Sequence, residues 1–553
     1  MTPLDWLIVI LYLGGMILMS FWLGRGQESQ EDYFVGGRDL PWWAVGLSTM
    51  ATQSSATSFI SIPAFVALKP DGGLKYLQWE LAVPLSMIFI MIFLIPFFRK
   101  LNLISVYEYL EKRFGSKTRT FLASVFLVSR GLGTGVGLYA VSIVIAVILS
   151  IQPLQAILLI GVITLIYDTI GGMKAVVYSD VIQMIVLMAG IAICSYYSFQ
   201  IGGGVEGLVA ALSGSSLSTG SGFDPSRLKA FDISHTGLGD GSNYNFWAMT
   251  LGGFFLYASY YGCDQSQTQR ELSAPTLADT KYSLIFNGLA RFPLIIMYVA
   301  MGVLLAAAYT SSPGFQELMS GYIDQSRFDY LLPVFILNFV PDGLRAIIFA
   351  AILAAAMSSL DSSLNSLSAS TMQDFVERYT GLSGSRKYFL IMSKVTTVLW
   401  GVFAIIAASG LHFLRSSDTV VEVINMVGSI FYGPILATFI MGVAVACVSG
   451  PAIITGVVCG VGFNLYLALF CPDISWLYWN AFGFLVAALV SYLSSLTIFR
   501  TVNRPDDSLI LWNSGVLAGQ KKWIPWYLVL LAYFLFIVFF SLTVSSWLTG
   551  FLP

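Results

Sequence analysis

A row of oxygen-bearing side chains interrupts an apolar stretch of the sequence at "AAAMSSLDSSLNSLSASTMQDF". Four of them share one helix face at i, i+3, i+4 and i+7 spacing: Ser358, Asp361, Ser362 and Asn365. Small hard cations prefer neutral and anionic oxygen ligands, and a monovalent ion needs little formal charge around it. This face therefore predicts a site for Na+ rather than for a divalent metal. A serine-rich face for close helix packing is the alternative.

A second polar interruption is "STMATQSSATSF", residues 48–59. Eight of its residues carry hydroxyl or amide side chains, and six of them fall within two turns: Thr52, Gln53, Ser54, Ser55, Thr57 and Ser58. A helix in lipid has no water to satisfy its backbone, so this density predicts a locally unwound segment whose carbonyls face a cavity. Close packing of helices through small hydroxyl residues is again the alternative.

A third interruption is "TIGGMKAVVYSDVIQ", residues 169–183, where a glycine pair ends one helix and Asp180 lies inside the next. A carboxylate at membrane depth costs about 2.5–3.5 kcal/mol on insertion scales, so Asp180 should face protein, water or a cation. The residues alone leave a functional and a structural role for Asp180 equally open.

The composition defines the class of protein that carries these segments. The 553 residues are 57% hydrophobic and only 10% charged, which is typical of a polytopic membrane protein. The net charge of −2, without a basic face or tail, excludes a nucleic-acid partner. Five scattered cysteines and two isolated histidines predict neither disulfides nor a metal centre. With no nucleophile–base pair or phosphate-binding loop in the sequence, we expect no enzyme activity and no cofactor.

Fourteen apolar windows are long enough to cross about 30 Å of hydrocarbon. They are 4–24, 41–67, 74–97, 120–149, 153–171, 175–199, 246–265, 279–309, 342–372, 387–411, 419–445, 451–471, 475–498 and 524–548. The first window lacks a basic leading region, so we expect a retained helix rather than a signal peptide. Lysine and arginine concentrate in alternate connections, which predicts that both termini are extracytoplasmic. We expect one integral membrane domain over residues 1–553.

Four motifs in order resemble those of the sodium:solute symporter family: "DYFVGGRDLPWWAVGLSTMATQSSATSF", "GGMKAVVYSDVIQ", "DQSQTQREL" and "AAILAAAMSSLDSSLNSLS". The resemblance runs from about residue 30 to the end of the eleventh window. It implies an all-α, LeuT-type fold with a five-plus-five inverted repeat. The leading helix would occupy 1–30, the two repeats 41–199 and 246–445, and three additional helices 451–553.

The resemblance also implies ion sites, residue by residue. The main Na+ site would use backbone carbonyls of Ala51, Ser54 and Ala355 and the hydroxyls of Ser358 and Ser359. A second cation site would use Asp180, Asp361 and Ser362. Asp361 departs from the small residue that several family members have at its position, so it either strengthens the second site or adds a proton-sensitive group.

The resemblance places a substrate cavity beside the broken helix. Its lining would be Gln53, Ser58, Gln78, Glu80, Tyr257, Arg291 and Asn425, with Tyr260 as an aromatic gate and Arg130 as a further cation. Arg291 stands where a sugar carrier has lysine, and a guanidinium favours bidentate binding of carboxylates. Internal ion pairs of the two arginines with Glu80, Asp180 or Asp361 are the alternative.

The resemblance therefore implies a Na+-driven symporter that imports a small polar solute by alternating access. The two arginines favour an organic anion, such as a monocarboxylate or an acidic sugar like sialic acid. A neutral sugar or polyol is the alternative substrate, and a H+-coupled carrier or a channel is less favoured. We expect a monomer as the functional unit, in the inner or plasma membrane of the cell.

Overall fold

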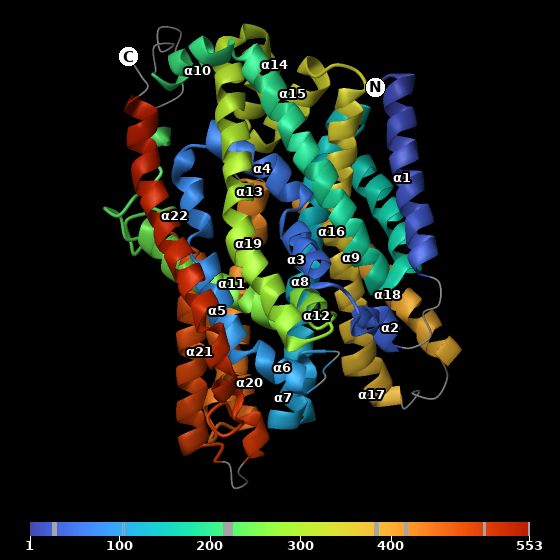
Figure 1. Ribbon diagram of the computed structural model, residues 1–553, viewed down its shortest axis with the longest axis vertical. Coiled ribbons are helices and arrows are strands. Elements are labelled where there is room, and N and C mark those ends of the chain that lie inside the picture. Colours follow the sequence, from blue (N-terminus) through green and yellow to red (C-terminus); the bar gives the residue numbers. More distant parts are fainter. Residues whose placement is uncertain are drawn as a thin grey trace.

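The structure is a computed structural model, and it describes residues 1–24, 30–101, 103, 105–213, 225–380, 386–413, 418–500 and 505–550. The described chain is a helical bundle without named strands, and one isolated bridge joins Leu238 to Ile474 (Figure 1). Eleven of the described helices are long and apolar enough to cross a membrane. The prediction of an all-α polytopic membrane protein is confirmed.

The remaining predicted spans are shorter or interrupted helices. Residues 41–67 form α3 (Trp42–Gln53) and α4 (Ala56–Ala67), and residues 246–265 form a π turn followed by α11 (Gly253–Cys263). The fifth and sixth windows form one long α9 (Pro153–Ile201), which Gly172 divides with a φ of 72°. Glycine adopts this left-handed conformation without a steric penalty, so the predicted helix boundary near the glycine pair is confirmed as a kink.

The other helices of the first part of the chain are α1 (Pro3–Leu23), α2 (Gln30–Val35), the 3-10 helix η2 (Leu74–Glu80), α5 (Val83–Phe93), α6 (Ile95–Lys100), α7 (Tyr107–Phe114), α8 (Ser116–Leu149) and α10 (Gly204–Leu212). The second part contains α12 (Gln265–Glu271), α13 (Leu277–Ser311), α14 (Pro313–Ile323), α15 (Leu331–Phe339), α16 (Leu344–Thr371), α17 (Glu377–Thr380), α18 (Arg386–Phe413), α19 (Val420–Ala444), α20 (Gly450–Phe470), α21 (Tyr478–Thr497) and α22 (Ile524–Gly550). The start of α1 and the end of α22 lie at the same end of the bundle, as an even number of crossings requires (Figure 1).

The polar run of residues 48–59 breaks its helix as predicted. The backbone leaves helical geometry at Ser54 (φ −83°, ψ 63°) and Ser55 (φ −74°, ψ 172°), and α4 starts at Ala56. Serine side chains compete for backbone hydrogen bonds, which makes such a break tolerable where protein groups surround it. The carbonyls of Thr52 and Gln53 therefore lack helical N–H partners, and they accept instead from the hydroxyls of Ser359 and Ser58 at 3.0 and 3.2 Å.

Close packing of α9 against α16 brings their polar residues together. A Cβ on Gly190 of α9 would lie 2.8 Å from the Cβ of Ala351 of α16, so only glycine permits this approach. The approach allows Asp180 of α9 to reach Ser358 of α16, with Ser358 Oγ donating to Asp180 Oδ1 over 2.5 Å. The oxygen-rich face of α16 thus points into the bundle and not toward lipid.

Candidate functional site

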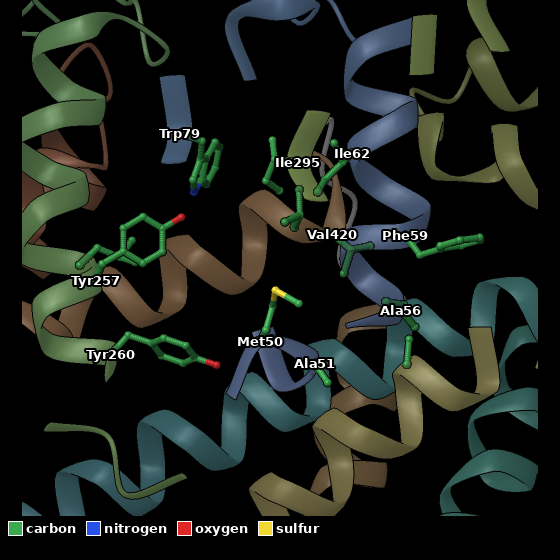
Figure 2. Close-up of a cluster of buried hydrophobic side chains, with 14 of the residues drawn as sticks. Met50, Ala51, Ala56, Phe59, Ile62, Trp79, Tyr257, Tyr260, Ile295 and Val420 are labelled. Carbon is green, nitrogen blue, oxygen red and sulfur yellow. The ribbon is translucent and has the colours of Figure 1, made fainter. Parts of the chain in front are cut away.

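A cavity opens beside the break between α3 and α4, where helices α8, α11, α13, α16 and α19 and the 3-10 helix η2 converge. Eight of the residues predicted to contact the substrate or to form the gate line it: Gln53, Ser58, Glu80, Arg130, Tyr257, Tyr260, Arg291 and Asn425. Figure 2 shows the rings of Tyr257 and Tyr260 extending from α11 toward Met50 and Ala51 at the end of α3. The cavity and the break are therefore one site.

Gln78 is the predicted substrate residue that the structure does not bring to this cavity. It is fully buried, and its Oε1 accepts a hydrogen bond of 3.4 Å from the backbone N–H of Asp232 in the long connection before α11. Residues i and i+3 share a face of a 3-10 helix, so Tyr76 and Trp79 face the cavity together, and their rings stack at 5.0 Å. Gln78 lies on another face of η2.

Arg291 is held by neighbouring protein groups. Its Nε lies 3.3 Å from Glu80 Oε1, and its Nη1 donates a 2.7 Å hydrogen bond to Ser54 Oγ at the break. Glu80 Oε1 also accepts from the hydroxyl of Tyr257 at 3.2 Å. The predicted internal ion pair between Arg291 and Glu80 is therefore present, and it fixes the position of the unwound segment.

Arg130 differs from Arg291 in its ion pair, which is longer, while the Nε of each arginine has no hydrogen-bond partner. Its Nη1 lies 3.6 Å from Asp264 Oδ2, beyond hydrogen-bond distance, and its buried Nε has no hydrogen-bond partner. Asp264 Oδ1 is engaged elsewhere, accepting from the backbone N–H and the hydroxyl of Ser266 at the start of α12. The Arg130 guanidinium also lies 5.8 Å from the ring centre of Tyr260. The Nε of Arg130 is thus a buried donor without a protein acceptor, while the guanidinium also interacts with the hydroxyls of Tyr260 and Tyr432.

The predicted gate residue, Tyr260, belongs to an aromatic and amide network. Gln267 Nε2 donates to the Tyr260 hydroxyl over 2.7 Å, and the Tyr260 ring lies 6.1 Å from that of Tyr432. The hydroxyl of Tyr261 donates to Gln53 Oε1, which orients that amide in the cavity wall. This network connects α11 and α12 to the broken helix and to α19.

The structure places the residues of the predicted main Na+ site at the junction of the break and α16. Ser359 Oγ donates a 3.0 Å hydrogen bond to the carbonyl of Thr52, and Ser359 also lines the cavity. Ala51 belongs to the last turn of α3, whose carbonyls point along the helix axis with a negative partial charge. The junction therefore offers neutral oxygen atoms and a favourable dipole to a monovalent cation.

The predicted second cation site contains a guanidinium. Arg270, the last basic residue of α12, is buried and donates from Nε to Ser48 Oγ over 2.8 Å and from Nη2 to Ser362 Oγ. Its Nη2 lies 3.4 Å from Asp180 Oδ2, which also accepts from Ser48 Oγ. Asp180 and Ser362 both contact Arg270. The carboxylate of Asp361 interacts electrostatically with the phenol of Tyr12 in α1.

Sequence reasoning missed several parts of this site. Arg270 was assigned to a connection between spans, and its burial next to Asp180 carried no signal except its place inside the "DQSQTQREL" motif. Further lining residues were not predicted: Thr52, Ser55, Tyr76, Trp79, Ser129, Thr134, Ser363 and Tyr432. Three of these lie in the polar run of residues 48–59 or on the serine face of α16, where the pattern already indicated a cavity.

The profile of the sodium:solute symporter family matches residues 33–460, most of the chain. The chain belongs to the sodium:solute symporter family. The sodium/sialic acid symporter NanT of Aliivibrio fischeri is 30% identical over 504 residues, which cover 91% of this chain and 95% of that one. The human sodium/iodide cotransporter is 28% identical, covering 82% and 68%. The sodium/glucose cotransporter of Vibrio parahaemolyticus is 26% identical, covering 94% of both chains.

A solved structure of a substrate-bound, outward-open Na+-coupled sialic acid symporter has the same overall architecture. Superposed on the present protein, it gives a TM-score of 0.75 at 25% sequence identity. The match covers 90% of this chain and 98% of the other. The predicted LeuT-type helical fold is therefore confirmed. Membership of this family of membrane transporters also agrees with the hydrophobic helices of the bundle.

Proposed function

We propose that this protein imports a small organic anion together with Na+, and that Arg130 binds the carboxylate or equivalent negative group of the solute. The observation that supports this assignment is the position of Arg130 in the cavity wall, where its Nε has no hydrogen-bond partner and its ion pair with Asp264 is 3.6 Å long. An incoming carboxylate can replace this long contact with short, charge-assisted hydrogen bonds. Arg291 instead keeps its role in holding Glu80 and Ser54.

The relatives support a negatively charged solute. Those named for sialic acid, iodide and monocarboxylates carry anions. A neutral sugar or polyol is the second candidate, because each cavity arginine already has a carboxylate near it and the wall offers amide and hydroxyl groups for sugar hydroxyls. The sodium/glucose cotransporter of Vibrio parahaemolyticus shows that this fold family includes a sugar carrier.

The proposed mechanism couples ion and solute through the broken helix. Na+ bound to carbonyls of Ala51, Ser54 and Ala355 and to the hydroxyls of Ser358 and Ser359 holds α16 against the end of α3. The 3.0 Å contact from Ser359 to Thr52 already joins these two elements. Because Ser54 also accepts from Arg291, an ion that orders the break also orders the cavity wall. Ion and solute therefore raise each other's affinity by linkage, and separation of α3 from α16 releases both.

The proposal also includes the orientation of the chain in the membrane and its oligomeric state. Both chain ends would lie on the extracytoplasmic side of the inner or plasma membrane, which the common end of α1 and α22 supports together with the distribution of basic residues (Figure 1). The proposal takes a monomer as the functional unit. No cofactor is needed beyond Na+ as the coupling ion.

The test combines a ligand screen with variants of the two arginines. Purified protein is screened by thermal shift with and without Na+ against acids, sugars, amino acids, vitamins and halides, and uptake of the best solute is measured in vesicles. We expect Arg130→Gln to lower kcat/KM for an acid about 100-fold, or about 3 kcal/mol, while leaving Na+-induced stabilisation intact. Arg130→Lys should recover only part, since lysine lacks the bidentate fork.

Three outcomes would contradict the proposal. A stabilising hexose with no response to any acid would replace the anion with the neutral sugar. Uptake of an acid that Arg130→Gln leaves unchanged would remove Arg130 from the solute site. Accumulation sustained by a pH gradient in Na+-free buffer would replace Na+ by H+ as the coupling ion.

A further inference from the structure

The last residue of α12, Glu271, is a fully buried carboxylate outside the proposed ion and substrate sites. It lies outside the membrane-spanning segments, between the helix that ends at Cys263 and the one that begins at Leu277. Helix α12 packs there against α3, α11 and α16. A carboxylate in such surroundings needs a cation, a set of donors or a proton to offset the loss of water.

The hydrogen bonds of Glu271 are unevenly divided between its two oxygens. Oε1 accepts from Thr49 Oγ1 of α3 at 3.1 Å and from Ser283 Oγ of α13 at 3.3 Å. Oε2 is buried without a hydrogen-bond partner. Throughout the described residues, no ion pair within 4.0 Å includes Glu271. Two neutral hydroxyl groups are a weak environment for a full negative charge.

Asn287 of α13 adds a second buried acceptor to the same cluster. Its Nδ2 donates to the carbonyls of Gly46 and Ser283, at 3.1 and 3.0 Å, while its Oδ1 has no donor. Gly46 and Thr49 lie one turn apart on α3, and Ser283 contacts both Asn287 and Glu271. The cluster thus contains two buried acceptor atoms without a donor, Glu271 Oε2 and Asn287 Oδ1. One additional proton on the Glu271 carboxyl would supply a donor.

The charged groups around Glu271 are engaged by other partners. Arg270, the preceding residue, is bound by Ser48, Ser362 and Asp180. Arg99 of α6 donates to the carbonyls of Leu272 and Pro275, and Arg38 donates to that of Leu272. On α13, Asp279 accepts from Thr276 at the start of the helix and interacts electrostatically with Arg99.

The balance of these effects favours the neutral acid. Burial raises the pKa of the Glu271 carboxyl to about 8, against the smaller opposing effects of Thr49, Ser283, Arg270 and Arg99. The carboxyl therefore titrates near neutral pH and not near 4.5, where an exposed glutamate does.

We propose that Glu271 is a proton-binding site, occupied when α3, α12 and α13 pack as in this structure and emptied when this junction opens to water. The turn that follows Glu271 is fastened to the segment before α3, because Leu40 N–H donates to the Ser273 carbonyl over 3.2 Å and Arg38 donates to that of Leu272. Separation of α3 from α12 would break these contacts and hydrate Glu271, which would then release its proton.

The sign of the pH dependence follows from these two states. A hydrated glutamate titrates near 4.5 and the buried one near 8, so in this window the packed junction holds a proton that the open junction has lost. Raising the pH by one unit between these limits shifts the equilibrium toward the open junction by up to about tenfold. Above pH 8 both states are ionised and the shift ends.

Infrared titration of the purified protein tests the proposal without any transported solute. We expect the wild type to show a protonated-carboxyl carbonyl band that disappears with a midpoint near pH 8, and Glu271→Gln to lack this band. Glu317→Gln, a matched change at an exposed glutamate of α14, should leave the band in place. If Glu271→Gln retains the same titrating band as the wild type, the proposal fails, whatever the transported solute is.

A second variant keeps the carboxyl and removes one of its hydroxyl donors. Ser283→Ala takes away a group that stabilises the ionised form, so we expect the midpoint of the band to rise by a few tenths to one pH unit. Ser283→Ala also tests the proposal if the Glu271→Gln variant does not fold. An unchanged midpoint in Ser283→Ala would show that the titrating acid is not Glu271 and would overturn the proposal.

Discussion

Two rows of serines on α16 contact different partners although they lie on one helix. Ser359 and Ser363 face the cavity, and Ser359 reaches the Thr52 carbonyl at the break. Ser358 and Ser362 instead contact Asp180 and Arg270, which are both almost completely buried. One row faces the cavity, and the other is hydrogen-bonded to Asp180 and Arg270, although Ser358 of that row is also among the proposed Na+ ligands.

The difference shows that the charged side chains fixed inside the bundle are kept apart from the proposed site of an exchangeable ion. Asp180 and Arg270 balance each other inside the bundle, so the oxygens around them already have a cation. The junction of α3 and α16 supplies carbonyls and hydroxyls without a carboxylate among its proposed ligands. A cation that binds there brings its own charge and can leave again, as transport requires.

Asp180→Asn should have the largest effect on this arrangement. The change leaves the buried guanidinium of Arg270 without its carboxylate, and breaking one partner of a buried pair costs about 3–5 kcal/mol. We expect a strongly lowered thermal midpoint in detergent, with partial recovery when Arg270→Met is added. A variant of normal stability with altered Na+ dependence would instead assign Asp180 to an ion.

Ser359→Ala should have an intermediate effect on the other row. Loss of one oxygen ligand from a cation costs about 1.5 kcal/mol, so the Na+ concentration for half-maximal uptake should rise about tenfold at unchanged expression. Ser358→Ala should raise it as well and also lower stability, because Ser358 donates to Asp180. Ser366→Ala, two turns further along α16 and outside the cavity lining, is the control. Unaltered Na+ dependence in both variants would remove α16 from the main ion site.

Ser362→Ala should have the smallest effect. It removes an acceptor from Arg270, so we expect about 1 kcal/mol lower stability and less than a twofold change in the Na+ concentration for half-maximal uptake. The Hill slope for Na+ should also stay as in the wild type. A slope that falls from near two to near one would show that a second Na+ displaces Arg270 during transport.

The sequence predicted features that depend on local composition. The break at Ser54 and the kink at Gly172 follow from a dense polar run and from a glycine pair, and every long helix coincides with an apolar window. The short helices α14 and α15 were treated as part of a long connection, because their apolar runs are too brief to stand out as spans.

The sequence did not predict features that depend on distant partners. The burial of Arg270 is compensated by Asp180, ninety residues away, and nothing near Arg270 in the sequence indicates that partner. The orientation of Gln78 depends on the 3-10 geometry of η2, which the hydrophobic pattern predicted only as the start of a span. Likewise, Arg130 and Arg291 have the same side chain, and only their different neighbours distinguish them.

The kink at Gly172 can act as a pivot between the two halves of α9. In its first half, a Cβ on Gly161 would meet Ile405 of α18, whereas in its second half Gly190 abuts Ala351 of α16. The two halves thus press on different helices, and Asp180 lies eight residues, or about 12 Å, beyond the pivot. A rotation of about 10° at Gly172 would displace Asp180 by about 2 Å, enough to separate it from Arg270.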